Sequence, residues 1–229
     1  TTRWGMKVSF MLIFLFLALR YNFGNDYKFY LSFFNKINQY EQHNYFHSSE
    51  QIEIGWVLIN RLFQPFGFFI MTAILALFNS VVYYRFINKY VQVNYQWFAV
   101  FLYAFSTGFM LIHSSAMRQS VAIGLFVFSM EYLFKKDIIR YFLCIGLASL
   151  FHGSAIVLLS VFLLALFNWR INRITGFVLI LVVLSLFLLK ESLAPYLDQF
   201  ISIYFSKYRK YEGTSVFGSG IGFIFSFVL

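Results

Sequence analysis

The chain has 229 residues, of which 60% are hydrophobic and 12% are charged, with 33 Phe and 16 Tyr. A soluble domain of this size cannot bury so much apolar surface, so the composition excludes the soluble globular classes and predicts an integral membrane protein. The net charge of +9 does not indicate a nucleic-acid partner, because the cations are spread among loops that flank apolar segments. We therefore expect the lipid bilayer as a partner, and no nucleic acid.

Repeated apolar runs of helix-spanning length, without short alternating segments, favour an all-α, polytopic transmembrane helix bundle over a β-barrel. We expect one transmembrane domain over residues 1–229, belonging to a longer protein and truncated at one or both ends, since the chain lacks an initiating Met and stops within an apolar run. It is expected to hold about eight spans, in chain order residues 4–19, 66–84, 95–112, 116–134, two short helices within 138–167 that meet at residues 152–154, residues 174–189 and a final truncated helix.

Two large polar and aromatic loops, residues 20–55 and 190–219, separate these spans and are expected to carry amphipathic helices. In the first loop Phe29, Phe33 and Ile37 recur at helical spacing, which predicts a helix lying along the membrane interface. A second helical stretch begins after Glu53 and reaches Gln64, where Pro65 ends or kinks it. Both loops are expected outside the cytoplasm.

The distribution of cations in the short connections predicts the orientation. Lys and Arg gather in alternate short loops, and such loops lie on the cytoplasmic side; they are Arg3, Lys7, Arg85, Lys89, Lys135, Lys136, Arg140, Arg170 and Arg173. The residues that could take part in catalysis or substrate binding fall on the opposite, non-cytoplasmic side. We therefore expect a multi-pass protein of the bacterial cytoplasmic (inner) membrane whose active site faces the periplasm or exterior.

The segment Ser115–Gly124 places Arg118 and Gln119 at the mouth of an otherwise apolar helix. An intramembrane arginine is a functional hypothesis by default, because it needs water, a partner or an anion. The planar guanidinium matches a diphosphate, and we expect Arg118 to hold one with help from Arg20 and from Tyr208, Arg209 and Lys210. The alternatives are snorkelling or a helix-end salt bridge for Arg118, snorkelling for Arg20 and headgroup contact for the basic segment 207–210.

His152 and Glu53 are the candidates for a general base. A histidine accepts a proton near neutral pH, although a lone histidine also caps helices or binds carbonyls. Glu53 is either the base or the residue that holds an arginine in place. Asp26 is a candidate substrate-binding residue, although it is the more structural of the two acids and could cap the following helix. Tyr27, with Tyr30 and Trp56, offers a face for sugar rings; aromatic abundance alone also explains those rings.

No metal or cofactor is expected. His43 and His47 are four residues apart but lack a third ligand with suitable spacing. The sequence has no GxGxxG, no P-loop and no GxSxG motif.

Four stretches in order, LRYNFGNDYKFY at 19–30, EIGWVLIN at 53–60, MRQSVA at 117–122 and LFHGSA at 150–155, resemble the EpsG family of bacterial polysaccharide polymerases, related to Wzy. The resemblance implies a membrane glycosyltransferase that transfers a growing glycan from undecaprenyl diphosphate onto another lipid-linked oligosaccharide. It also implies partners of the same pathway, namely a chain-length regulator and a flippase. The alternatives are a lipid-linked glycan ligase, a lipid-linked oligosaccharide flippase or transporter, and an O-acyltransferase.

Overall fold

The computed structural model describes residues 3–39, 52–106 and 109–166, which lie in the first of two units, residues 1–167 and 168–229. The described residues form helices and no strand, which confirms the all-α prediction. The elements are α1 (Arg3–Ala18), α2 (Tyr27–Lys36), η1 (Ile37–Gln39), α3 (Ile54–Phe63), α4 (Phe68–Tyr90), η3 (Val93–Tyr95), α5 (Gln96–Phe105), α6 (Met110–Ser115), α7 (Met117–Phe134), α8 (Ile138–Ser149), η4 (Gly153–Leu158) and α9 (Leu159–Leu166).

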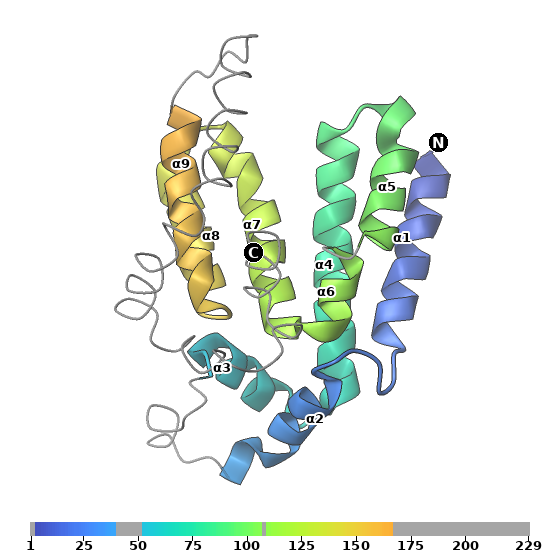
Figure 1. Cartoon of the computed structure of the whole chain (residues 1–229), viewed down its shortest axis with the longest axis vertical. Coiled ribbons are helices and arrows are strands. Elements are labelled where there is room, and N and C mark those ends of the chain that lie inside the picture. The colour runs from blue at the N-terminus through green and yellow to red at the C-terminus, as the bar shows by residue number, and fades with distance from the viewer. Residues whose placement is uncertain (1–2, 40–51, 107–108, 167–229) are drawn as a thin grey trace, which may run out of the picture. The chain divides into compact units, whose positions relative to one another are not determined.

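The long helices pack side by side in the order α1, α4, α7 and α8 (Figure 1). The shorter α2 and α3 lie at the end where α1 stops and where α4 and α7 begin (Figure 1). One apolar core joins residues of α2, α3, α4, α7 and α8, and a second joins α1, α4 and α5. This arrangement brings the polar loop after α1 onto the first turns of the long helices.

Two helical stretches in the described part have the length and apolar character of a membrane span, Phe68–Tyr90 and Val93–Ser115. The second passes over residues 107 and 108, which are outside the described ranges, and the expected single helix 95–112 is divided there into α5 and α6. The expected spans 174–189 and the last helix, with the loop 190–219, also lie outside those ranges. The number of eight crossings therefore stays a prediction.

Local sequence signals explain several helix ends. Helix α3 ends at Phe63, just before Pro65, as expected from the missing N–H of proline. Gly67 then takes φ +91° and starts α4, a backbone conformation that residues with a Cβ rarely adopt. The predicted break in residues 138–167 is also present, although it lies at residues 150–152 and not at 152–154, since α8 ends at Ser149 and η4 begins at Gly153.

Helix α2 packs into the protein through a face that differs from the predicted one. Its buried residues are Tyr27, Tyr30, Phe33 and Phe34, followed by Ile37, whereas Phe29 is exposed. The expected Phe29, Phe33 and Ile37 stripe was therefore wrong at Phe29. A tyrosine ring buries a large apolar surface, and its hydroxyl can reach a polar partner. The spacing of Tyr27 and Tyr30 therefore indicates the buried face of α2 better than the phenylalanine spacing does.

Glycines allow the short elements to approach the long helices closely. Gly24 has φ +104°, and a Cβ there would overlap the Ser114 carbonyl oxygen at the end of α6. Gly55 donates its backbone N–H to the Leu150 carbonyl oxygen at 2.8 Å, and a Cβ on Gly55 would lie 2.7 Å from that oxygen. The contact between α3 and the end of α8 thus needs a residue without a side chain.

Gly55→Ala tests this contact. We expect a loss of about 1–3 kcal/mol in the free energy of unfolding, because backbone atoms must move apart to admit the methyl group. Gly146→Ala is the matched control, since nothing lies within 4 Å of its added Cβ; as an Ala replacing a mid-helix Gly it should stabilise by up to about 1 kcal/mol. Denaturant unfolding of the two purified variants measures both, and equal effects would contradict the close contact.

Candidate functional site

An ion pair joins the starts of α7 and α3. Arg118 is the second residue of α7, and Glu53 immediately precedes α3 as its N-cap residue. Arg118 Nη1 donates to Glu53 Oε2 at 2.5 Å, and the two side chains are only 25% and 10% exposed. The helix-end salt bridge considered for Arg118, and the role of Glu53 in holding an arginine, both agree with this geometry.

Tyr30 of α2 forms the third member of this cluster. A hydrogen bond joins the Tyr30 hydroxyl and the Arg118 side chain. Burial raises the pKa of Tyr30, and the Arg118 charge opposes that rise. The Tyr30 ring packs edge-to-face on Trp56 of α3, with ring centroids 5.0 Å apart. Arg118 is therefore oriented from two sides, by a carboxylate and by a phenol.

Arg20 follows α1 and is buried at the same end of the unit, with only 9% of its surface exposed. Its Nη1 donates to the carbonyl oxygen of His113 in α6 at 2.5 Å. Burial lowers the pKa of Arg20 to about 10, and Tyr27 and Tyr30 oppose this effect, so the guanidinium keeps its charge at neutral pH. This burial contradicts the snorkelling alternative for Arg20.

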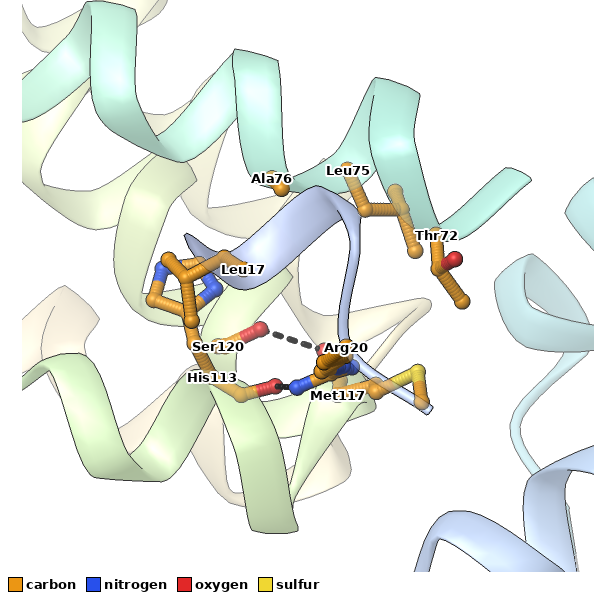
Figure 2. A pocket seen from close by; sticks show the side chains of 8 residues that line it. All are labelled: Leu17, Arg20, Thr72, Leu75, Ala76, His113, Met117 and Ser120. Carbon is orange, nitrogen blue, oxygen red and sulfur yellow. Dashed lines mark hydrogen bonds between the residues drawn. The ribbon is translucent and has the colours of Figure 1, made fainter. Parts of the chain in front are cut away.

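A small pocket lies beside Arg20, between the end of α1 and helices α4, α6 and α7 (Figure 2). Its volume of about 10 Å³ is roughly the room that one water molecule needs. The lining mixes apolar and polar side chains; the residues are Leu17, Arg20, Thr72, Leu75, Ala76, His113, Met117 and Ser120. His113, which lines this pocket, also contacts α4: Asn79 Nδ2 lies 3.2 Å from His113 Nδ1, which accepts the bond because an amide nitrogen only donates. Helix α4 thus carries buried polar side chains, among them Thr72 and Asn79.

Both arginines keep a buried donor without an acceptor. In the described part of the chain, Arg20 Nε and Arg118 Nε have no hydrogen-bond partner. The charge of each guanidinium acts on the Tyr30 phenol. Unpaired buried donors are rare in folded proteins and indicate a bound water, ion or ligand. A guanidinium with a spare N–H group suits an anion with several oxygens.

Asp26 precedes α2 and behaves differently from the expected cap. It occupies the N-cap position, but its side chain makes no capping hydrogen bond. Burial raises its pKa, and the charge of Arg118 opposes this rise. By contrast Asp137, the N-cap residue of α8, accepts the backbone N–H of Arg140 at 3.2 Å. The expectation that Asp26 caps its helix was therefore wrong.

The remaining predicted residues fall into three groups. His152 is half-buried before η4, two residues beyond Leu150, whose carbonyl binds Gly55; this contact brings its segment to the start of α3. Gln119 is half-buried next to Arg118. Tyr208, Arg209 and Lys210, with the histidine pair at positions 43 and 47, lie outside the described residues.

The buried rings of α2 and α3 do not match the sugar-stacking expectation. Tyr27, Tyr30 and Trp56 are at most 2% exposed, so protein covers their faces. These aromatics build the core beneath the cluster instead, because their rings fill the space between α2, α3 and α4. As for metals, the described ranges contain no group of three His, Cys, Asp or Glu residues that could hold an ion.

Two contacts of the site were not foreseen from the sequence. The bond between Tyr30 and Arg118 follows from the inward face of α2, which the spacing of Tyr27, Tyr30, Phe34 and Ile37 could have indicated. The contact of Arg20 with the His113 carbonyl carries no sequence signal, because it depends on where α6 ends against the loop after α1.

A model of the EpsG family matches residues 4–229 of the chain. The match covers α1 to α9, so every residue of the cluster around Arg118 lies within it. No curated protein and no solved structure matches the chain.

A double-mutant cycle with Glu53→Gln and Arg118→Gln measures the ion pair. We expect a coupling free energy of about 1.5–3 kcal/mol, the range for hydrogen bonds to charged groups, because neither side chain is well hydrated. The control is the exposed pair of Glu131 and Lys135, which are 2.7 Å apart and should couple by only about 0.3–0.5 kcal/mol as an i,i+4 pair. Similar coupling in both cycles, from unfolding curves, would contradict the sheltered character of the first pair.

Proposed function

The chain belongs to the EpsG family, and we propose from this premise that it polymerises lipid-linked oligosaccharide repeat units into a polysaccharide. EpsG-type proteins are Wzy-like polysaccharide polymerases, and the apolar helices agree with a membrane protein. The donor that we propose is an oligosaccharide on undecaprenyl diphosphate. The acceptor is a second lipid-linked repeat unit.

One observation carries the choice of donor, namely the two largely buried arginines whose charges both act on Tyr30. The Nε donors of both guanidiniums lack partners within the described ranges, and a diphosphate offers several anionic oxygens to them. Within the described residues Arg20 donates to the His113 carbonyl and forms no ion pair, so an anion beside it would relieve a buried positive charge. Arg209, outside the described residues, is proposed to add to this site.

The charges at the opposite end support an orientation with the arginine cluster outside the cytoplasm. Lys89 and Lys135 both contact Glu131 there, at 2.8 and 2.7 Å. The neighbouring Arg85, Lys136 and Arg140 make that end basic, which is typical of short cytoplasmic connections. The proposed location is the bacterial inner membrane, with the site facing the periplasm or exterior.

The proposed reaction is the transfer of the glycan from the diphosphate to an acceptor hydroxyl. The bond between the anomeric carbon and the diphosphate oxygen breaks, and its electron pair stays on the diphosphate. The hydroxyl oxygen forms the new glycosidic bond and gives up its proton to a base. Arg118 and Arg20 stabilise the negative charge that develops on the leaving group, and orientation of the two substrates supplies much of the remaining acceleration.

Glu53 and His152 were the two candidates for the base. Because the carboxylate of Glu53 is bound by Arg118, we propose that Glu53 holds the arginine in place. His152 is then the base candidate that the sequence indicates. Gln119 is proposed to assist in substrate binding from its place beside Arg118.

Arg118→Lys tests the role of the guanidinium. Lysine keeps the charge but loses the planar fork, so we expect elongation to fall about 100-fold or more, as when one preorganised donor to a developing oxyanion is removed. Arg140→Lys is the control, an exposed arginine at the other end that lies 3.4 Å from Asp137. The measurement is the rate at which purified protein elongates synthetic undecaprenyl-diphosphate-linked repeat units, followed as a product ladder.

The pattern of products distinguishes the alternatives. A ladder supports the polymerase, a single addition would indicate a glycan ligase, and movement of the lipid between vesicle leaflets without new linkages would indicate a transporter. Full elongation by the Arg118→Lys variant would contradict the proposed site.

A further inference from the structure

Two lysines from different helices share one carboxylate at the end of the unit that lies away from α2 and α3 (Figure 1). The Nζ atoms of Lys89, in the last turn of α4, and of Lys135, the C-cap residue of α7, lie 2.8 and 2.7 Å from the same Oε1 atom of Glu131. The two cations are therefore close neighbours. Their side chains are 48% and 63% exposed. Because an ammonium group has more than one N–H donor, each keeps donors for a further acceptor.

Further exposed cations surround this pair. Arg85 lies one helical turn before Lys89 on the same face of α4, and the loop and first turn after Lys135 carry two more cations. We call this set the basic edge; its members are Arg85, Lys89, Lys135, Lys136 and Arg140. Helices α4, α7 and α8 and the loop between α7 and α8 contain only two acids, Glu131 and Asp137. The five cations therefore exceed the acids by three charges.

The backbone at Lys136 carries a lysine where glycine is the usual residue. Helix α7 ends in a Schellman motif, in which the Lys136 N–H donates to the Leu133 carbonyl at 3.1 Å and the Asp137 N–H donates to the Tyr132 carbonyl at 2.9 Å. Lys136 holds the left-handed position of this motif with φ +56°. Glycine adopts that conformation without steric cost, and a residue with a Cβ does not. The cation at this position is thus present at a cost in backbone energy, which is a reason to look for its role.

Aromatic rings place the basic edge at the depth of lipid headgroups. Lys89 Nζ lies 5.5 Å from the centroid of the Tyr90 ring, and Tyr90 packs on Phe134 with ring centroids 5.0 Å apart. The guanidinium carbon of Arg140 lies 5.8 Å from the centroid of the Tyr132 ring. Phe134 is 54% exposed although charged residues adjoin it. Aromatic rings at the ends of apolar helices, beside cations, are typical of the interface between membrane and water.

From these contacts we propose that the basic edge binds the headgroup phosphate of an anionic phospholipid. The neighbouring ammonium groups of Lys89 and Lys135 donate to the phosphate oxygens, Lys136 adds its charge from the loop, and the exposed Phe134 ring contacts the upper part of the acyl chains. The inference requires a membrane protein but not a polymerase. It therefore goes beyond the proposed function and can fail independently of it.

The charge excess favours an anionic lipid over a zwitterionic one. A phosphatidylcholine headgroup has no net charge and leaves the excess uncompensated, whereas phosphatidylglycerol supplies a negative charge, and every nearby cation adds to the attraction. Helix C-termini also favour cations, which explains Lys89 and Lys135 without a lipid. That explanation makes Lys136 a stabilising residue of the helix end. Lipid binding instead makes it a residue that is kept in spite of its backbone.

Lys136→Gly distinguishes these two explanations in purified full-length protein in a neutral detergent. Glycine relieves the left-handed backbone, so the midpoint of thermal unfolding without lipid should rise by about 1–4 °C. The lost cation should weaken the binding of phosphatidylglycerol about fivefold, measured by native mass spectrometry of the protein with increasing lipid. A lowered midpoint would assign the lysine to the helix end, and an unchanged affinity would exclude it from the lipid site; either result contradicts its proposed role.

Replacing Lys89 and Lys135 together by Gln tests the pair. We expect phosphatidylglycerol to bind about 10-fold more weakly or worse, because two cations are lost and the Glu131 charge is left without them. The matched control replaces Lys28 and Lys36 by Gln, two exposed lysines of α2 at the opposite end. It removes the same charge and should change the affinity less than about twofold, since distant exposed charges are screened. Equal losses in the two variants would show that net charge and not the basic edge attracts the lipid, which would overturn the proposal.

Two further probes identify the ligand. Phosphatidylcholine should bind wild-type protein at least about tenfold more weakly than phosphatidylglycerol, and equal binding would contradict the electrostatic basis of the site. Inorganic phosphate at the same concentration should not displace phosphatidylglycerol, because it lacks acyl chains; displacement would indicate a site for free anions instead of lipids. None of these measurements depends on elongation, so their failure leaves the polymerase function untouched. An excess of phosphatidylglycerol keeps the basic edge filled when diphosphate lipids are measured at the arginines.

Discussion

The hydrogen-bonded pair of Arg118 and Glu53 determines how the described unit is arranged at its polar end. Arg118 starts α7 and Glu53 precedes α3, so the pair fixes a short helix against the first turn of a long one. Tyr30 adds α2 to the same guanidinium. Three segments that are distant in sequence therefore converge on one cation. Without the carboxylate and the phenol, a guanidinium at this depth would be left with an uncompensated charge.

The apolar packing beneath this end makes the convergence possible. Trp56, Tyr30 and Phe68 belong to one core that also contains Met117, the residue just before Arg118. Gly55 and Gly24 let backbone reach backbone at two points, against Leu150 and Ser114. The aromatic residues of α2 and α3 thus support the charged cluster, and their faces are covered. Rigid support of this kind is what a site needs when its action depends on the direction of hydrogen bonds.

Much of this was predictable, and the parts that were not have a physical reason. Composition and helix-length apolar runs indicated an all-α membrane protein, and the helix ends at Pro65 and near His152 followed from local chemistry. Arg118 stood out because a charge in an apolar segment needs a partner. The pairing of Arg118 with Glu53 and the burial of Arg20 against His113 depend on contacts between segments 65 and 93 residues apart. No periodicity within one helix encodes such contacts.

The most direct test is to measure the binding of undecaprenyl diphosphate to purified protein, with Arg20→Gln and Arg118→Gln beside the wild type. If the two guanidiniums form one diphosphate site, each substitution removes charge-assisted hydrogen bonds of about 1.5–3 kcal/mol and weakens binding about 10- to 100-fold. Lys89→Gln, at the opposite end near Glu131, should leave binding unchanged. Equal affinity of all four proteins for the diphosphate lipid would contradict a site built from Arg20 and Arg118.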